Sequence, residues 1–166
     1  MAKKALAIAW DGNLPVIPGN IATKIIATEM SPDAVCTRRT VIVRPMRLYH
    51  DNPVSSRGFY DKEKNIFVCE YNPGEHPVRQ RYASAHVLGQ VVLSNPLNRV
   101  YENRSYPADT SDPLEQQARQ FALELLMPKR MVRELFPVAR SIEQFSEAFG
   151  VPTIAMRYRL KDLGLI

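Results

Sequence analysis

The sequence contains little cysteine and no long apolar run. Its two cysteines, Cys36 and Cys69, are far apart among 166 residues and form no pair of metal ligands. Without a secretory context we expect reduced thiols in a cytoplasmic protein. No apolar stretch approaches the length that spans a bilayer, so no membrane association is expected. Asp11 and Gly12 interrupt the short apolar start of the chain, which argues against a signal peptide.

The length and charge leave several function classes open. A chain of this size is expected to form one compact domain, with at most a small appendage. The net charge of +5 and the pI of about 9.4 permit a nucleic-acid or acidic partner. Basic residues are usually a solvated surface, however, so the charge alone does not indicate such a partner. A nucleic-acid-binding regulator that uses Arg157, Arg159 and Lys161 is kept as a third hypothesis.

Capping residues, prolines and hydrophobic periodicity predict a mixture of helices and strands. Asn20 can cap a helix, and the β-branched run that ends at Arg44 is typical of a strand. From the N-terminus, the predicted elements are a helix over 21–30, a strand over 40–44, a hairpin of strands 56–61 and 65–70, a helix over 79–93, a long loop over 97–113, and helices over 114–127, 129–136, 141–149 and 152–163.

The predicted helix over 79–93 carries the most informative pattern. His86 and Gln90 are four residues apart and therefore share one helix face. This is the spacing of the H-E-x-x-H helix, in which two histidines bind zinc and the glutamate acts as the base. Here Val87 stands where the glutamate would be, and Gln90 stands where the second histidine would be. The scaffold of a metallopeptidase helix is present without two of its three chemical residues.

Three blocks of the sequence resemble the ImmA/IrrE family of zinc metallopeptidases, which also includes phage and mobile-element regulators. The blocks are 79–93, 115–128 and 149–165, with weaker similarity over 14–26 and 58–72. The resemblance implies an α+β, zincin-like fold, in which helices pack on a small, mainly antiparallel sheet. It also implies a metallopeptidase-like domain over 1–136 and a helical C-terminal unit over 137–166 packed on it.

Carried over by position, the family's zinc ligands would be His86, Gln90 and Glu115, with Val87 at the position of the base. A carboxamide is a poor zinc ligand, and valine cannot accept a proton. His86 and Glu115 alone would bind zinc weakly, so no cofactor is expected unless the site has been rebuilt. His50 or His76 could replace the missing ligand. The alternatives are a structural, hydrogen-bonded His86 and a Glu115 that is merely favoured by the helix dipole.

The resemblance therefore favours a catalytically degenerate, metallopeptidase-like regulator that binds a protein partner, such as a helix-turn-helix repressor. An antirepressor-like role linked to a phage or mobile element is one form of this hypothesis. A partner segment could add a strand at the sheet edge. The alternative is an active zinc peptidase that cleaves a repressor-type protein. Candidate residues of the binding groove or its lid are Arg79, Arg81, Tyr101, Tyr106 and Asp112; the two arginines oppose the helix dipole and could instead brace a neighbouring loop or partner.

Overall fold

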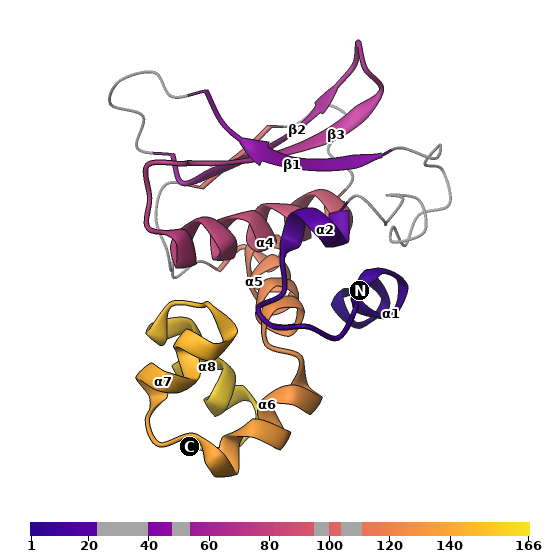
Figure 1. Cartoon of the computed structure of the whole chain (residues 1–166). Coiled ribbons are helices and arrows are strands. Elements are labelled where there is room, and N and C mark those ends of the chain that lie inside the picture. Colours follow the sequence, from indigo (N-terminus) through magenta and orange to yellow (C-terminus); the bar gives the residue numbers. More distant parts are fainter. Residues whose placement is uncertain (23–39, 48–53, 95–99, 104–110) are drawn as a thin grey trace.

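The computed structural model describes residues 1–22, 40–47, 54–94, 100–103 and 111–166 (Figure 1). The elements, in chain order, are α1 (Ala2–Ala9), α2 (Pro18–Ala22), β1 (Val41–Pro45), β2 (Ser56–Asp61), β3 (Ile66–Tyr71), α4 (Pro77–Ser94), β4 (Tyr101–Asn103), α5 (Pro113–Leu126), α6 (Lys129–Leu135), a 3₁₀ turn (Phe136–Val138), α7 (Ile142–Phe149) and α8 (Thr153–Asp162).

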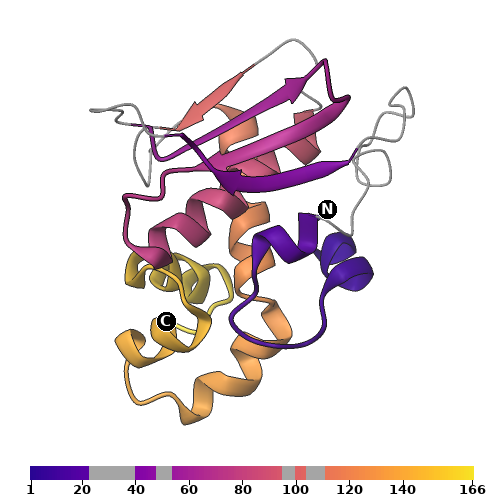
Figure 2. The same cartoon turned by 45° about the horizontal axis from the view of Figure 1, so that its top comes forward.

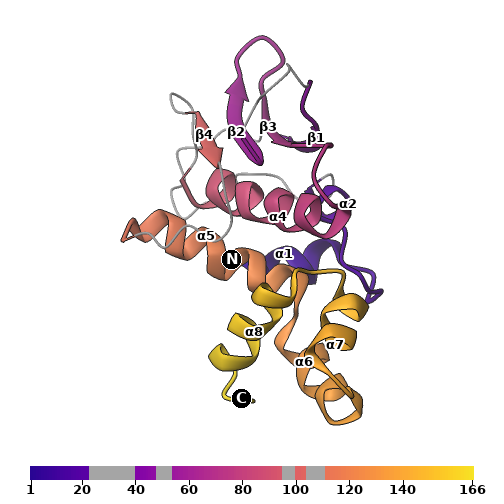
Figure 3. The same ribbon diagram turned by 90° about the vertical axis from the view of Figure 1, so that its left-hand side faces the viewer.

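The fold is α+β, as the sequence predicts, with a mixed sheet lying over layers of helices (Figures 1 and 3). The strands described lie in the order β1-β3-β2-β4. β1 runs parallel to β3, whereas β2 is antiparallel to both β3 and β4, so the sheet is mainly antiparallel. α4 packs beneath β2 and β3, and α5 packs against α4.

The predicted β2–β3 hairpin is confirmed, and its turn follows from local chemistry. The carboxylate of Asp61 accepts hydrogen bonds from the backbone N–H groups of Glu63 and Lys64, both at 3.1 Å. Asn65 takes the left-handed conformation with φ of 54°, which asparagine adopts more readily than most residues. The turn thus sets the register of β3 and thereby the face on which each of its side chains lies.

Close helix packing brings α4 and α5 together at Gly89. A Cβ atom added there would lie 3.0 Å from the Phe121 ring and 3.1 Å from the Ala118 carbonyl oxygen. The sheet approaches α4 in the same way at Gly58, where an added Cβ would lie 2.8 Å from the Val87 side chain. Two glycines therefore allow α4 to be pressed between the sheet and α5.

Helix caps explain where α5 and α7 begin and where α7 ends. The Asp112 carboxylate accepts a hydrogen bond from the N–H of Leu114 at 2.9 Å, and the Ser141 hydroxyl accepts one from the N–H of Gln144 at the start of α7. The side chain of Gln144 in turn accepts a hydrogen bond from the N–H of Arg140, just before the cap. α7 ends at Gly150, whose φ of 59° suits glycine.

The C-terminal helices share the core of the rest of the chain. Phe145, Phe149 and Met156 belong to the same buried cluster as the residues of α4 and α5. Arg159 is buried as well; its Nε donates to the carbonyl of Met127 at 2.9 Å, and its guanidinium pairs with Glu124. Figure 2 shows α7 and α8 on the helical side of the molecule, away from the sheet.

Several elements depart from the sequence prediction. Met1–Trp10, assessed only as a possible signal peptide, contains α1, and none of the helices in the described ranges combines the length and apolar character needed to cross a bilayer. α2 begins at Pro18, before the expected start at Ile21; the remainder of the helix predicted up to residue 30 lies outside the described residues. The predicted loop over 97–113 contains β4, which adds a strand to β2.

Candidate functional site

The three residues assigned from the family resemblance lie together. His86 and Gln90 project from one face of α4 toward the first turn of α5, where Glu115 lies. The Nε2 of His86 is 3.4 Å from one carboxylate oxygen of Glu115. The amide nitrogen of Gln90 donates a hydrogen bond to the other oxygen. The close crossing at Gly89 explains this convergence. Because α4 and α5 approach each other there, the side chains of His86 and Gln90 on α4 can reach Glu115 on α5.

Gln90 is a buried donor in this arrangement. Its side chain is almost completely enclosed, and its backbone carbonyl accepts a hydrogen bond from the Ser94 hydroxyl at 2.5 Å. A buried carboxamide needs hydrogen-bond partners, and the carboxylate of Glu115 supplies one that carries a full charge. The bond therefore joins α4 to α5.

His86 is neutral at physiological pH. Burial lowers its pKa to about 4, partly offset by a backbone hydrogen bond with Glu115, and the nearby Arg119 lowers the pKa further. The ring is stacked on Tyr82, with 6.2 Å between the ring centres. A neutral imidazole suits either a metal ligand or a structural hydrogen bond, so the protonation state does not distinguish the two roles.

Val87, which the resemblance assigns to the position of the base, packs against the sheet. It is fully buried, and its Cγ2 would lie 2.8 Å from a Cβ at Gly58. Its contacts are those of a core residue between α4 and β2. The position therefore supplies packing and no group that could accept a proton.

The donor set among the described residues does not fit zinc. Within those ranges, no three His, Cys, Asp or Glu side chains are grouped so that they could hold a metal ion. Gln90 presents an amide nitrogen, which is a hydrogen-bond donor without a lone pair for a metal. His76 precedes α4 by one residue, about 15 Å along the axis from His86 at 1.5 Å per residue, so it does not replace the missing ligand. His50 lies outside the described residues.

The predicted groove and lid residues separate into different roles. Arg79 is exposed on the first turn of α4, whereas Arg81 donates to the carbonyl of Gly150 at 2.6 Å and so braces the end of α7. Tyr101, a candidate for the groove or its lid, lies in β4 with its side chain buried. Asp112 caps α5, and Tyr106 lies outside the described residues.

Sequence reasoning missed two charged features. Arg119 lies one turn after Glu115 on α5 and lowers the pKa of His86; the four-residue spacing is the signal that could have found it. The second feature is Glu70, a carboxylate buried on the sheet between Arg44 and Arg57. A glutamate at the end of an apolar strand was its only sequence signal.

Comparison with known proteins places the chain in a family. A sequence profile of the IrrE N-terminal-like domain matches residues 46–161. The chain belongs to this family. Metallopeptidase ImmA of Bacillus subtilis (strain 168) is 31% identical over 107 residues, which cover 63% of this chain and 62% of the relative. The matched region therefore spans less than two thirds of that relative's length, and the profile match includes both α4 and α5 of the site.

Proposed function

We propose that this member of the IrrE N-terminal-like family is a catalytically degenerate regulator that acts by binding a protein partner. The observation that carries the proposal is the hydrogen bond from the Gln90 amide to Glu115. If this chain held zinc in the manner of the family, the side chains at positions 90 and 115 would each donate a lone pair to the metal. Here the two side chains satisfy each other.

The second support is the missing base. A zinc peptidase needs a metal-activated water and a group that takes its proton. General base catalysis contributes roughly 10²–10⁴-fold to such reactions, and Val87 cannot supply it. A weakly held metal and an absent base would both slow the activation of the attacking water, so together they would lower the rate of peptide hydrolysis further than either alone.

The kind of partner rests on the family resemblance. A repressor of the helix-turn-helix class is the partner it implies, and the role would then be antirepressor-like, in a phage or mobile element. A groove that once positioned a peptide for cleavage can hold a partner segment without cutting it. Among the strands described, β1 and β4 are the sheet edges to which such a segment could add a strand.

Metal content tests the proposal directly. We expect the protein purified without chelators, and dialysed against metal-free buffer, to contain far less than one zinc per chain by elemental analysis. His86→Ala should then leave the zinc content unchanged. About one zinc per chain that His86→Ala removes, together with cleavage of a repressor-type substrate, would establish the opposite reading of an active peptidase with a rebuilt metal site.

A further inference from the structure

The sheet has a second face that the remnant site does not use. Along β3, Phe67 and Cys69 belong to the core beneath the sheet, so the alternating residues Val68 and Glu70 point to the opposite side. We call this side the outer face. None of the described helices covers it, because they all lie on the core side of the sheet (Figures 1 and 3).

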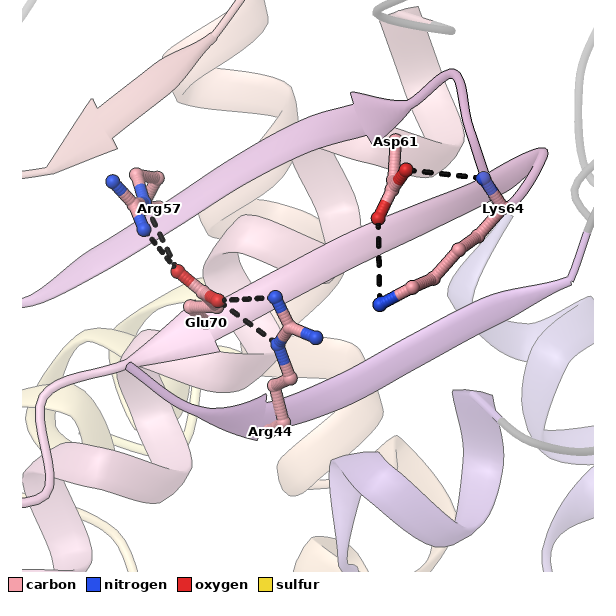
Figure 4. Close-up of polar contacts among 5 residues, drawn as sticks. All are labelled: Arg44, Arg57, Asp61, Lys64 and Glu70. Atoms are coloured by element: carbon pink, nitrogen blue, oxygen red, sulfur yellow. Dashed lines mark hydrogen bonds and ion pairs between the residues drawn. The ribbon is translucent and has the colours of Figure 1, made fainter. Parts of the chain in front are cut away.

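A buried carboxylate organises two arginines on the outer face (Figure 4). Glu70 lies opposite Arg44 of β1 and opposite Arg57 of β2 in the strand register. One of its oxygens accepts from the Nε of Arg44 at 2.9 Å, and the other accepts from the Nε of Arg57 at 3.0 Å. Both guanidinium groups are therefore held side-on to one carboxylate, which limits the entropy they would lose on binding a ligand.

The exposure of these groups is unequal, and this decides the sign of the surface. The side chain of Glu70 is 5% exposed, whereas Arg44 and Arg57 are 40% and 38% exposed. The same arrangement recurs beside them, where Asp61 is 19% exposed and its partner Lys64 is 62% exposed. In both clusters the acid is more deeply buried than its basic partners, so a partner that approaches these two clusters meets the cations first.

Apolar side chains lie next to the arginines. Ile42, Val68 and Phe59 stand opposite one another on the three neighbouring strands, two residues along each strand from the arginine row. Val68 is fully buried, so Ile42 and Phe59 are the partly exposed members of this row. The guanidinium of Arg57 lies 5.3 Å from the centre of the Phe59 ring, which fixes both groups further. Two exposed acids lie nearby: Glu63 in the hairpin turn, and Glu102, which stands opposite Arg57 in the register of the edge strand β4. The cations on this face, Arg44, Arg57 and Lys64, outnumber Glu102.

We infer that the outer face of the sheet, centred on Arg44, Arg57 and Phe59, binds an acidic segment of the partner protein. The inference rests on the proposed function for the existence of a protein partner. Carboxylates of the partner would meet the outward amino groups of the two guanidiniums, because the Nε sides are occupied by Glu70. Apolar residues between those carboxylates would meet the row that contains Phe59. If the charge triad of Arg44, Glu70 and Arg57 only stabilised the sheet, the outer face would bind no such segment.

A peptide probe tests this without a known partner. The probe is a fluorescent amphipathic peptide of alternating Glu and Leu, and its twin carries Gln in place of Glu. The test variant is Arg44→Gln/Glu70→Gln/Arg57→Gln, which removes two positive charges and one negative charge and avoids an unpaired buried carboxylate. Its control is Arg130→Gln, which also lowers the net charge by one, at an exposed ion pair with Glu134 on α6.

Fluorescence anisotropy should show that the acidic probe binds about tenfold more tightly than its Gln twin. The triple variant should lose about tenfold in affinity for the acidic probe, the control should stay within about twofold, and added salt should weaken binding. Amide chemical shifts on the wild-type protein, which need no variant, should change over residues 41–45, 56–61 and 66–71.

Three results would overturn the inference: equal binding of the two peptides, equal losses in the triple variant and the control, or shift changes centred on His86 in α4. Loss of the fold in the triple variant would leave the wild-type shift map to decide. A finding of stoichiometric zinc would refute the proposed function but would not alter these binding outcomes, so the two failures are distinguishable.

Discussion

Replacing Gln90 by histidine tests whether His86, residue 90 and Glu115 can together hold a metal ion. The substitution gives α4 two histidines four residues apart, facing the carboxylate of Glu115. It also removes the hydrogen bond by which Gln90 holds that carboxylate. Because bonds to charged groups contribute about 1.5–3 kcal/mol, we expect Gln90→His to lower the free energy of unfolding by about that amount when zinc is absent.

Zinc should then restore what the substitution loses. Three protein ligands and a water complete a tetrahedral site, so Gln90→His should bind zinc orders of magnitude more tightly than the wild type. At a free zinc concentration of 100 times the Kd, binding stabilises the folded state by about 2.7 kcal/mol. For a chain of this size, that corresponds to a rise in Tm of about 5–10 °C. The wild type should show little change at the same concentration.

The matched control is Gln90→Ala, which loses the same hydrogen bond and supplies no ligand. The assay is thermal unfolding with and without zinc, accompanied by calorimetric titration. Equal zinc responses of Gln90→His and Gln90→Ala would refute the reasoning, since they would mean that His86, residue 90 and Glu115 do not converge on one metal. Adding Val87→Glu to restore the base is a separate step, because that position is fully buried and a carboxylate there would need repacking against Gly58.

Three further predictions concern the frame around the site. Gly58→Ala should lower the unfolding free energy by about 1–3 kcal/mol through overpacking, and a second change, Val87→Ala, should recover part of the loss in denaturant titrations. Arg81→Gln should destabilise by about 1–3 kcal/mol because it orphans the carbonyl at the end of α7, whereas the exposed Arg79→Gln should stay within about 0.5 kcal/mol. A chain without residues 137–166 should melt well below the full chain, because core side chains are lost; an equal Tm would make that unit an independent appendage.

Local chemistry made much of the fold predictable from the sequence. The hairpin follows from two β-branched and aromatic runs around a polar turn, and Asp112 and Ser141 carry the signals of helix starts. The strand β4 was missed because three residues in a polar stretch give no periodicity; only pairing with β2 defines it. The convergence of His86 and Glu115 came from the family resemblance, since 29 residues of spacing do not fix a distance.

The charge triad on the sheet shows why other features escaped. Arg44 and Glu70 meet because β1 pairs with β3 in parallel. These two strands are neighbours in the sheet, although β2 lies between them in the sequence. Such a contact depends on the register between the two strands, because a slip of one residue would move the side chains of one strand to the other face of the sheet. The burial of Arg159 escaped for a related reason: its partners, Met127 and Glu124, lie on another helix. Both cases turn on contacts between elements, where sequence patterns carry little information.

The crossing at Gly89 has a consequence for how this family can diverge. α4 and α5 can approach closely because residue 89 is glycine. The backbone oxygen of Ala118 and the ring of Phe121 leave no room for a Cβ atom there. The residues that would perform chemistry, at positions 86, 87 and 90, lie beside this crossing and do not set it. Substitutions at these three positions can therefore change the chemistry of the site while Gly89 keeps the close approach of α4 and α5.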